Sequence, residues 1–184
     1  MITEKFNTII AEVFDVLVRV ENDNVEKLIS EILLANRIVV CGAGRVGYAI
    51  RGFGMRLGHL GRSAYAVGDT TLPAMRSGDL LLVASGSGET QTIFDLVEIS
   101  KRNGCRIVSI TGSCNSRIAK ISDVVVIVPA PSKTKSVAGR QSVQPMTTLN
   151  EQCLSLFFDA VVLILMDRLN ETHETMWSRH SNLE

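Results

Sequence analysis

Short apolar runs that alternate with segments of helical length are the feature that most limits how this chain can fold. The runs are rich in β-branched residues and lie at 37–41, 64–67, 79–84, 106–110 and 123–128. The segments between them suit helices at 46–60, 89–103 and 116–121. Runs of this kind are typical of parallel strands that are buried on both faces. The alternation therefore predicts an α/β fold, a three-layer αβα sandwich around a doubly wound, five-stranded parallel sheet.

Helical periodicity flanks this pattern on both sides. In the first 36 residues, apolar side chains recur at steps of three and four, which predicts two amphipathic helices. Residues 148–169 form a longer segment that is apolar around most of its circumference. We expect this last helix to be buried in the core and in a subunit interface. The chain is thus expected to be one domain over 1–184, with a helical pair at about 1–36 and C-terminal helices at about 148–184.

The balance of charges disfavours some classes of partner. The chain has 19 Lys and Arg against 19 Asp and Glu, so its formal net charge is zero. General binders of nucleic acids or membrane surfaces rely on a basic face, and we expect neither partner here. A small anion needs only a local site, so a phosphorylated ligand remains possible.

The cysteines and the start of the chain indicate a cytoplasmic location. The four cysteines are scattered, without a CxxC pair or a histidine at ligand spacing, so we expect reduced thiols and no metal site. The N-terminal segment is amphipathic and of mixed charge, unlike a secretory signal. The longest apolar stretch, 153–166, is short for a membrane span and contains Ser155 and Asp159.

Two glycine-rich turns follow strands of the predicted sheet. The first, after the first strand, is Gly42-Ala43-Gly44-Arg45-Val46-Gly47, and the second, after the third strand, is Ser85-Gly86-Ser87-Gly88-Glu89-Thr90. Ligands of parallel sheets bind beyond the carboxyl ends of the strands, where helix N-termini present free amides. Both turns are therefore candidates for one binding site.

The first turn matches the dinucleotide fingerprint G-x-G-x-x-G, and Asp69 lies where a ribose-binding acid would be expected. A dinucleotide enzyme needs further chain to bind its substrate, however, and only helices are expected after the fifth strand. The second turn would also have no role in such an enzyme. A dinucleotide site is thus the weaker interpretation.

The second turn has the composition of a phosphate-binding loop. Its glycines let backbone amides approach a phosphate, and Ser85, Ser87 and Thr90 add hydroxyl donors. No Gly-Lys-Ser/Thr follows, which disfavours nucleotide hydrolysis. We expect the Glu89 carboxylate to cap the following helix, because a phosphate would repel it. A serine–glycine turn that merely caps a helix is the plain alternative.

The combination of these turns resembles the sugar isomerase (SIS) domain family. The resemblance rests on Ser-Gly-Ser-Gly-Glu-Thr at the end of a strand and on the preceding Cys-Gly-Ala-Gly-Arg turn. Further segments, at 55–61, 68–71, 144–146 and in the tail Arg179-His180-Ser181-Asn182-Leu183-Glu184, resemble one branch, the 6-phospho-3-hexuloisomerases. The resemblance covers essentially the whole chain and implies a flavodoxin-like fold.

This resemblance implies a reaction that interconverts D-arabino-hex-3-ulose 6-phosphate and D-fructose 6-phosphate through a cis-enediol. One base must move a proton between neighbouring carbons, and no metal or redox cofactor is needed. The implied partner is a phosphorylated ketose, and the implied assembly is a homo-oligomer, with a tetramer favoured. Substrate binding is assigned by the resemblance to Gly44, Arg45, Ser85, Gly86, Ser87, Gly88, Glu89 and Thr90.

Glu151 is the candidate base. Family members have a Pro-Leu-Gly-Thr-x-Phe-Glu-like stretch, which corresponds here to Pro145-Met146-Thr147-Thr148-Leu149-Asn150-Glu151. Thr147 replaces the usual glycine and Asn150 the usual phenylalanine, so the exact substrate stays open. A partly buried carboxylate can act as a base, because burial raises its pKa. The alternative for Glu151 is a capping box with Thr148.

His180 is the second catalytic candidate, as the acid–base that opens the furanose ring. The resemblance implies that the tail packs into a neighbouring subunit's site, whereas the alternative is a solvated histidine on a frayed end. His59 is expected to be structural. Lys133, Lys135 and Arg140, on a loop expected at 130–144, are either a solvated cluster or a lid over an anion.

Two further functions stay open. A different SIS isomerase, specific for another sugar phosphate, would fit the unusual Thr147 and Asn150. A non-catalytic module that binds phosphosugars would also use the SIS fold, but such modules are commonly fused to DNA-binding segments, and this chain has no room for one.

Overall fold

Five parallel strands form the centre of the computed structural model, which describes residues 1–131 and 141–183. They are β1 (Ile38–Gly42), β2 (Ala64–Ala66), β3 (Leu80–Ser85), β4 (Arg106–Thr111) and β5 (Val124–Ile127). Their order in the sheet is β2-β1-β3-β4-β5, the flavodoxin-like order, and all pairs are parallel. The predicted five-stranded, doubly wound sheet is confirmed.

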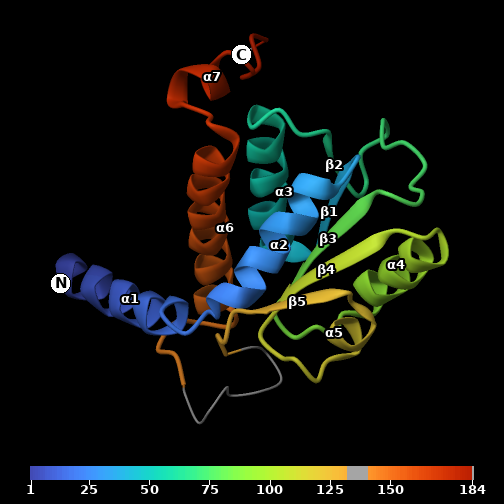
Figure 1. Cartoon of the computed structure of the whole chain (residues 1–184). Coiled ribbons are helices and arrows are strands. Elements are labelled where there is room, and N and C mark those ends of the chain that lie inside the picture. Colours follow the sequence, from blue (N-terminus) through green and yellow to red (C-terminus); the bar gives the residue numbers. More distant parts are fainter. Residues whose placement is uncertain (132–140, 184) are drawn as a thin grey trace.

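Helices cover both faces of this sheet (Figure 1). One face is covered by α4 (Gln91–Arg102) and α5 (Arg117–Ile121), the other by α2 (Asn22–Leu34) and α3 (Gly44–His59). The long α6 (Thr148–Leu169) packs on α3, on α2 and on α1 (Ile2–Leu17). A short α7 (His173–Trp177) follows it. The three-layer arrangement is therefore as predicted.

Alternation along the strands explains why their sequences are continuously apolar. Val39 of β1 and Leu81 of β3 face α4 and α5, whereas the next residues, Val40 and Leu82, face α3 and α2. Successive side chains of a strand point to opposite faces, so both must be apolar when both faces are covered. Two hydrophobic cores result, one on each side of the sheet.

The last long helix has the bounds that its sequence predicts, 148–169. By length and composition alone α6 could cross a membrane, but half of its most apolar window is buried inside this chain. Phe158 stacks on Phe53 of α3 with ring centroids 4.8 Å apart, and Cys153, Leu154 and Leu165 are fully buried. The expected burial of α6 in the core is confirmed.

The N-terminal helix is only partly packed. The two predicted helices are present, but α1 projects from the body of the chain (Figure 1) and buries only Val13 and Val16. Apolar side chains on its outer face are more than half exposed: Phe6, Ile10 and Phe14. The predicted amphipathic helix is therefore confirmed, and it carries further apolar side chains that this chain by itself leaves exposed.

Two predicted helix starts differ from the structure, and one predicted loop lies mostly outside the described residues. Helix α4 begins at Gln91 with Thr90 as its N-cap, so Glu89 does not cap it. The start of α3 is Gly44, two residues earlier than predicted. Most of the loop expected at 130–144, with Lys133, Lys135 and Arg140, falls at 132–140, outside the described residues.

The glycines of the first turn hold strand and helix together. A Cβ atom on Gly47 would lie 2.7 Å from the carbonyl oxygen of Gly42. Gly52, on the outside of the same helix, has nothing within 4 Å of such an atom. The fingerprint-like spacing therefore serves close packing of α3 on β1.

We predict that Gly47→Ala lowers the free energy of unfolding by about 1–3 kcal/mol, because the backbone of the turn must shift. The matched variant Gly52→Ala should raise it by about 0.5–1 kcal/mol through the helix propensity of alanine. Urea denaturation measures both. Equal effects of the two substitutions would contradict the packing role of Gly47.

Candidate active site

A pocket of about 600 Å³ lies beyond the carboxyl ends of β1 and β3. Its walls come from the turn after β1, the loop after β3 and the first turn of α6. Of the residues that the sequence analysis singled out, the following line it: Gly44, Arg45, Ser85, Gly86, Ser87, Glu89, Thr90 and Glu151. Gly88 lies within the loop. The two glycine-rich turns thus share one site, as predicted.

Helix N-termini give this pocket a positive character. The helices α3, α4 and α6 all begin at its wall, and their N-cap residues Ala43, Thr90 and Thr147 make no side-chain capping hydrogen bond within the described part of the chain. The first amides of each helix are therefore left for another acceptor. Free amides and the positive ends of helix dipoles favour an anion.

Hydroxyl groups of the loop after β3 organise its own backbone. Ser85 Oγ accepts a hydrogen bond from Gly88 N at 3.1 Å, and Ser87 Oγ accepts one from Glu89 N at 3.2 Å. Thr90 Oγ1 lies 3.3 Å from Ser85 Oγ. A hydroxyl that accepts can still donate its own proton, so the serines shape the loop and remain donors to a ligand.

Gly88 is required by the geometry of this loop. Its φ is +65°, and a Cβ atom would lie 2.1 Å from Ser116 Oγ. Residues other than glycine rarely adopt this conformation, and the contact leaves no space for one. The loop is therefore fixed by its glycine on one side and by α5 on the other.

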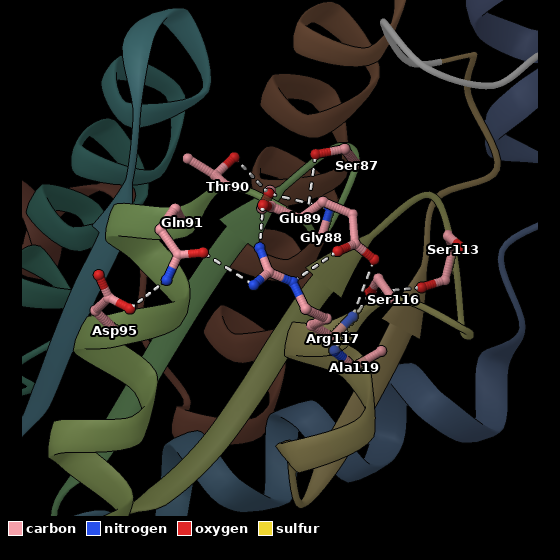
Figure 2. Close-up of polar contacts among 11 residues, drawn as sticks. Ser87, Gly88, Glu89, Thr90, Gln91, Asp95, Ser113, Ser116, Arg117 and Ala119 are labelled. Atoms are coloured by element: carbon pink, nitrogen blue, oxygen red, sulfur yellow. Dashed lines mark hydrogen bonds and ion pairs between the residues drawn. The ribbon is translucent and has the colours of Figure 1, made fainter.

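Glu89 is held by α5 instead of capping α4 (Figure 2). Its carboxylate accepts hydrogen bonds from the backbone N of Arg117 at 3.1 Å and from Nε at 2.9 Å. The same guanidinium donates to the Glu89 carbonyl at 2.8 Å and to Gln91 Oε1 at 2.9 Å. Arg117 begins α5, so Glu89 satisfies the start of that helix. Arg117 lies 28 residues from Glu89, and no pattern in the sequence predicts this contact.

Glu151 lies in the first turn of α6 and is mostly buried, with 13% of its side chain exposed. Thr147 Oγ1 donates to its Oε1 at 2.7 Å. Arg45 Nε lies 3.1 Å from Oε2 in an ion pair, but Oε2 accepts no hydrogen bond from the described residues. The capping box with Thr148 is wrong: Thr147 is the N-cap, and the carboxylate does not bond to its amide. The carboxylate thus lines the pocket, with Oε1 hydrogen-bonded to Thr147 and Oε2 paired with the Arg45 cation.

The segment that precedes α6 is tied to α1 through Glu12. Its carboxylate accepts hydrogen bonds from Ser142 Oγ, Val143 N and Gln144 Nε2 at 2.8–2.9 Å. Burial alone would raise the pKa of Glu12, but these donors outweigh it and hold the pKa below its usual value. This anchor positions the chain just before the pocket-lining Met146 and Thr147.

Neither Cys41 nor Asp69 lines the pocket. Burial raises the pKa of the Cys41 thiol to about 11 although the Arg51 cation opposes the shift, so the group is protonated at neutral pH. Asp69 pairs with Arg51 at 3.0 Å and accepts from Ala66 N at 3.1 Å. It stabilises the turn after β2 and does not line the pocket, which disfavours a ribose site. In the described residues, no group of three His, Cys, Asp or Glu could hold a metal ion.

His180 lies far from the pocket of its own chain. The tail follows α7, beyond the end of α6 that is remote from Glu151 (Figure 1), and a 22-residue helix is about 33 Å long. Arg179 Nη1 donates to the carbonyl of His59 at 2.9 Å, and the rings of His59 and His180 are 5.2 Å apart. The tail is therefore docked, not frayed. His59 is buried, as its structural interpretation predicts.

Comparisons with known proteins agree with this geometry. A model of the SIS domain family matches residues 31–156. The chain is 40% identical to the 3-hexulose-6-phosphate isomerase of Mycobacterium gastri, covering 100% of this chain and 92% of the relative. The 3-hexulose-6-phosphate isomerase of Bacillus subtilis is 35% identical, with 99% and 98% covered.

Solved structures with the same fold include a Methanococcus jannaschii protein for which a function of 3-hexulose-6-phosphate isomerase was inferred. It superposes with a TM-score of 0.86 at 29% identity, covering 98% of this chain and 99% of that one. A phosphoheptose isomerase from Francisella tularensis superposes with a TM-score of 0.65 at 16% identity, which shows the shared fold.

We predict that Arg117→Met weakens fructose 6-phosphate binding about tenfold, or about 1.4 kcal/mol, because the loop after β3 loses its support. The exposed pair itself should contribute less than about 1 kcal/mol to folding. Arg168→Met is the matched control, since it removes a surface ion pair with Glu26 that is remote from the pocket. Calorimetric titration measures both, and equal affinities for the two variants would contradict the support role.

Proposed function

Because the chain belongs to the SIS domain family, we propose that it is a 6-phospho-3-hexuloisomerase. It would interconvert D-arabino-hex-3-ulose 6-phosphate and D-fructose 6-phosphate. The observation that carries the proposal is the Glu151 carboxylate, which Thr147 and Arg45 hold in the same pocket as the loop after β3. Full-length relatives that carry this enzyme's name support the choice of substrate.

In the proposed reaction, Glu151 removes the proton from C2 of the hex-3-ulose phosphate. The electrons of that C–H bond form the C2–C3 double bond of a cis-enediol, and the C3 carbonyl oxygen takes up a proton from solvent to become a hydroxyl. Glu151 then returns its proton to C3 while the O2–H bond breaks and its proton passes to solvent, which gives the C2 ketone. This sequence is proton transfer throughout, so the proposal includes no cofactor.

Arg45 has two parts in this proposal. Its Nε lies 3.1 Å from Glu151 Oε2, so the cation orients the base. The guanidinium is also 62% exposed at the pocket wall, where it can stabilise negative charge that develops on O2 or O3. The phosphate would bind the loop of residues 85–90 and the amides at the start of α4.

We also propose that the enzyme is a homo-oligomer, with a tetramer favoured, in which His180 of one subunit completes a neighbour's site. Apolar surface on α1 and exposed Leu156 and Leu163 on α6 support an interface. The whole chain would act as one SIS domain. Four free cysteines, three of them buried, and zero net charge support a cytoplasmic enzyme without nucleic-acid or membrane partners.

For Glu151→Gln we predict a loss of about 10²–10⁴-fold in kcat, the usual contribution of a general base. Fructose 6-phosphate should still bind, because the amide keeps the shape of the carboxylate. Formation of fructose 6-phosphate from the 3-hexulose phosphate is the assay, with the exposed Glu26→Gln as control. Unchanged turnover would exclude Glu151 as the base. If another phosphorylated ketose is turned over faster by the unmodified enzyme, the chain is a different SIS isomerase.

A shared site predicts that two inactive variants restore each other. His180→Ala and Glu151→Gln subunits, mixed and reassembled, should regain about a quarter of wild-type activity, since that share of sites combines intact residues from two chains. Each variant reassembled alone is the control. Failure of the mixture to regain activity, with mixed oligomers demonstrated by mass spectrometry, would exclude a shared site.

A further inference from the structure

Asn150 is buried without a partner for its amide. It lies in the first turn of α6 and is 1% exposed, and its Nδ2 has no hydrogen-bond partner among the described residues. Buried amides are normally satisfied, because one left unpaired destabilises the folded state. Asn150 lines the pocket, so its unpaired amide points to a group that binds there.

The amide of Asn150 packs against the loop after β3. A Cβ atom placed on Gly86 would lie 2.5 Å from Asn150 Oδ1 and 3.2 Å from Nδ2. Both residues line the pocket. On the same helix turn, the Glu151 carboxylate is directed to Arg45. Asn150 therefore lies between the loop expected to bind phosphate and the carboxylate expected to act as base.

An apolar side chain would suit this position better for stability alone. The surroundings of α6 are apolar, with Leu149 and Cys153 also buried. An amide that is retained at a cost to folding indicates a function, because stability is commonly sacrificed where a site needs polar groups.

We propose that Asn150 is a specificity-determining residue whose amide hydrogen-bonds a hydroxyl in the middle of the sugar chain. The inference rests on the proposed function. With the phosphate at the loop and C2 and C3 at Glu151, the oxygens between them in a 6-phosphohexulose are those of C4 and C5. A 180° turn of the amide exchanges its nitrogen and oxygen without changing its shape, so it can donate or accept.

The decisive variant is Asn150→Leu, which keeps the volume and removes the hydrogen-bonding groups. We expect the melting temperature to rise by about 2–4 °C, because a buried unpaired amide is removed. The Kd for fructose 6-phosphate should rise at least about tenfold. Ser109→Ala is the matched control, because Ser109 is equally buried, its Oγ is also unpaired, and it does not line the pocket. It should stabilise the protein without changing Kd or turnover.

Deoxy analogues identify the hydroxyl. The unmodified protein should bind either 4-deoxy- or 5-deoxyfructose 6-phosphate much more weakly than fructose 6-phosphate, because the buried amide is then left unpaired. Asn150→Leu should bind that analogue and fructose 6-phosphate equally. If Asn150→Leu does not fold, the analogue measurements on the unmodified protein decide.

The proposal is overturned if the Kd of Asn150→Leu stays within about twofold of wild type, or if both deoxy analogues bind the unmodified protein as well as the parent sugar does. These are binding measurements, which need no turnover. Failure of the isomerase reaction would therefore be detected separately, by the absence of fructose 6-phosphate formation in the unmodified enzyme.

Discussion

The parallel pairing of β1 with β3 is the constraint on which the rest of the structure depends. From β1 the chain crosses to β2 on one side, and from β3 it crosses to β4 on the other. The register opposes Gly42 and Ala84, so the two glycine-rich turns leave the sheet at the same level. Since α3 and α4 then run on opposite faces, the two turns diverge and leave the opening that becomes the pocket.

The first turn of helix α6 forms one wall of that opening and places polar side chains in it, which could discriminate between ligands. The core residues of α6, such as Phe158 against Phe53, fix the helix on α3. This packing also holds the first turn of the helix, with its polar side chains, at the pocket. Asn150 and Glu151 are thereby kept at the pocket, although the buried Nδ2 of Asn150 has no hydrogen-bond partner among the described residues. Apolar packing along the helix thus offsets the cost of polar groups at its start.

Much of the fold could be predicted from the sequence, because its strands and helices leave periodic patterns of apolar residues. Strands buried on both faces and a helix apolar on most sides leave continuous patterns, so the sheet and the bounds of α6 could be predicted. The glycine-rich turns were predictable as a site because they follow strands directly. The contacts of Arg117 with Glu89 and of Glu12 with the segment before α6 were not, because they join elements far apart in the sequence and have no period. Thr90 was not predicted as the N-cap of α4. The sequence does not show that the Glu89 carboxylate accepts a hydrogen bond from the backbone N of Arg117, at the start of α5.

The length of α6 also bears on the separation of Glu151 and His180. One end of the helix holds Glu151, the proposed base, and the other leads to the tail, so a single chain keeps the two residues a helix length apart. Two α6 helices packed antiparallel about a two-fold axis would bring the tail of each close to the start of the other. Leu156 and Leu163, seven residues apart and both exposed, lie on one face of α6 and would form the seam of such a contact. The same helix would then supply the base, the subunit contact and the path of the tail to the neighbouring site.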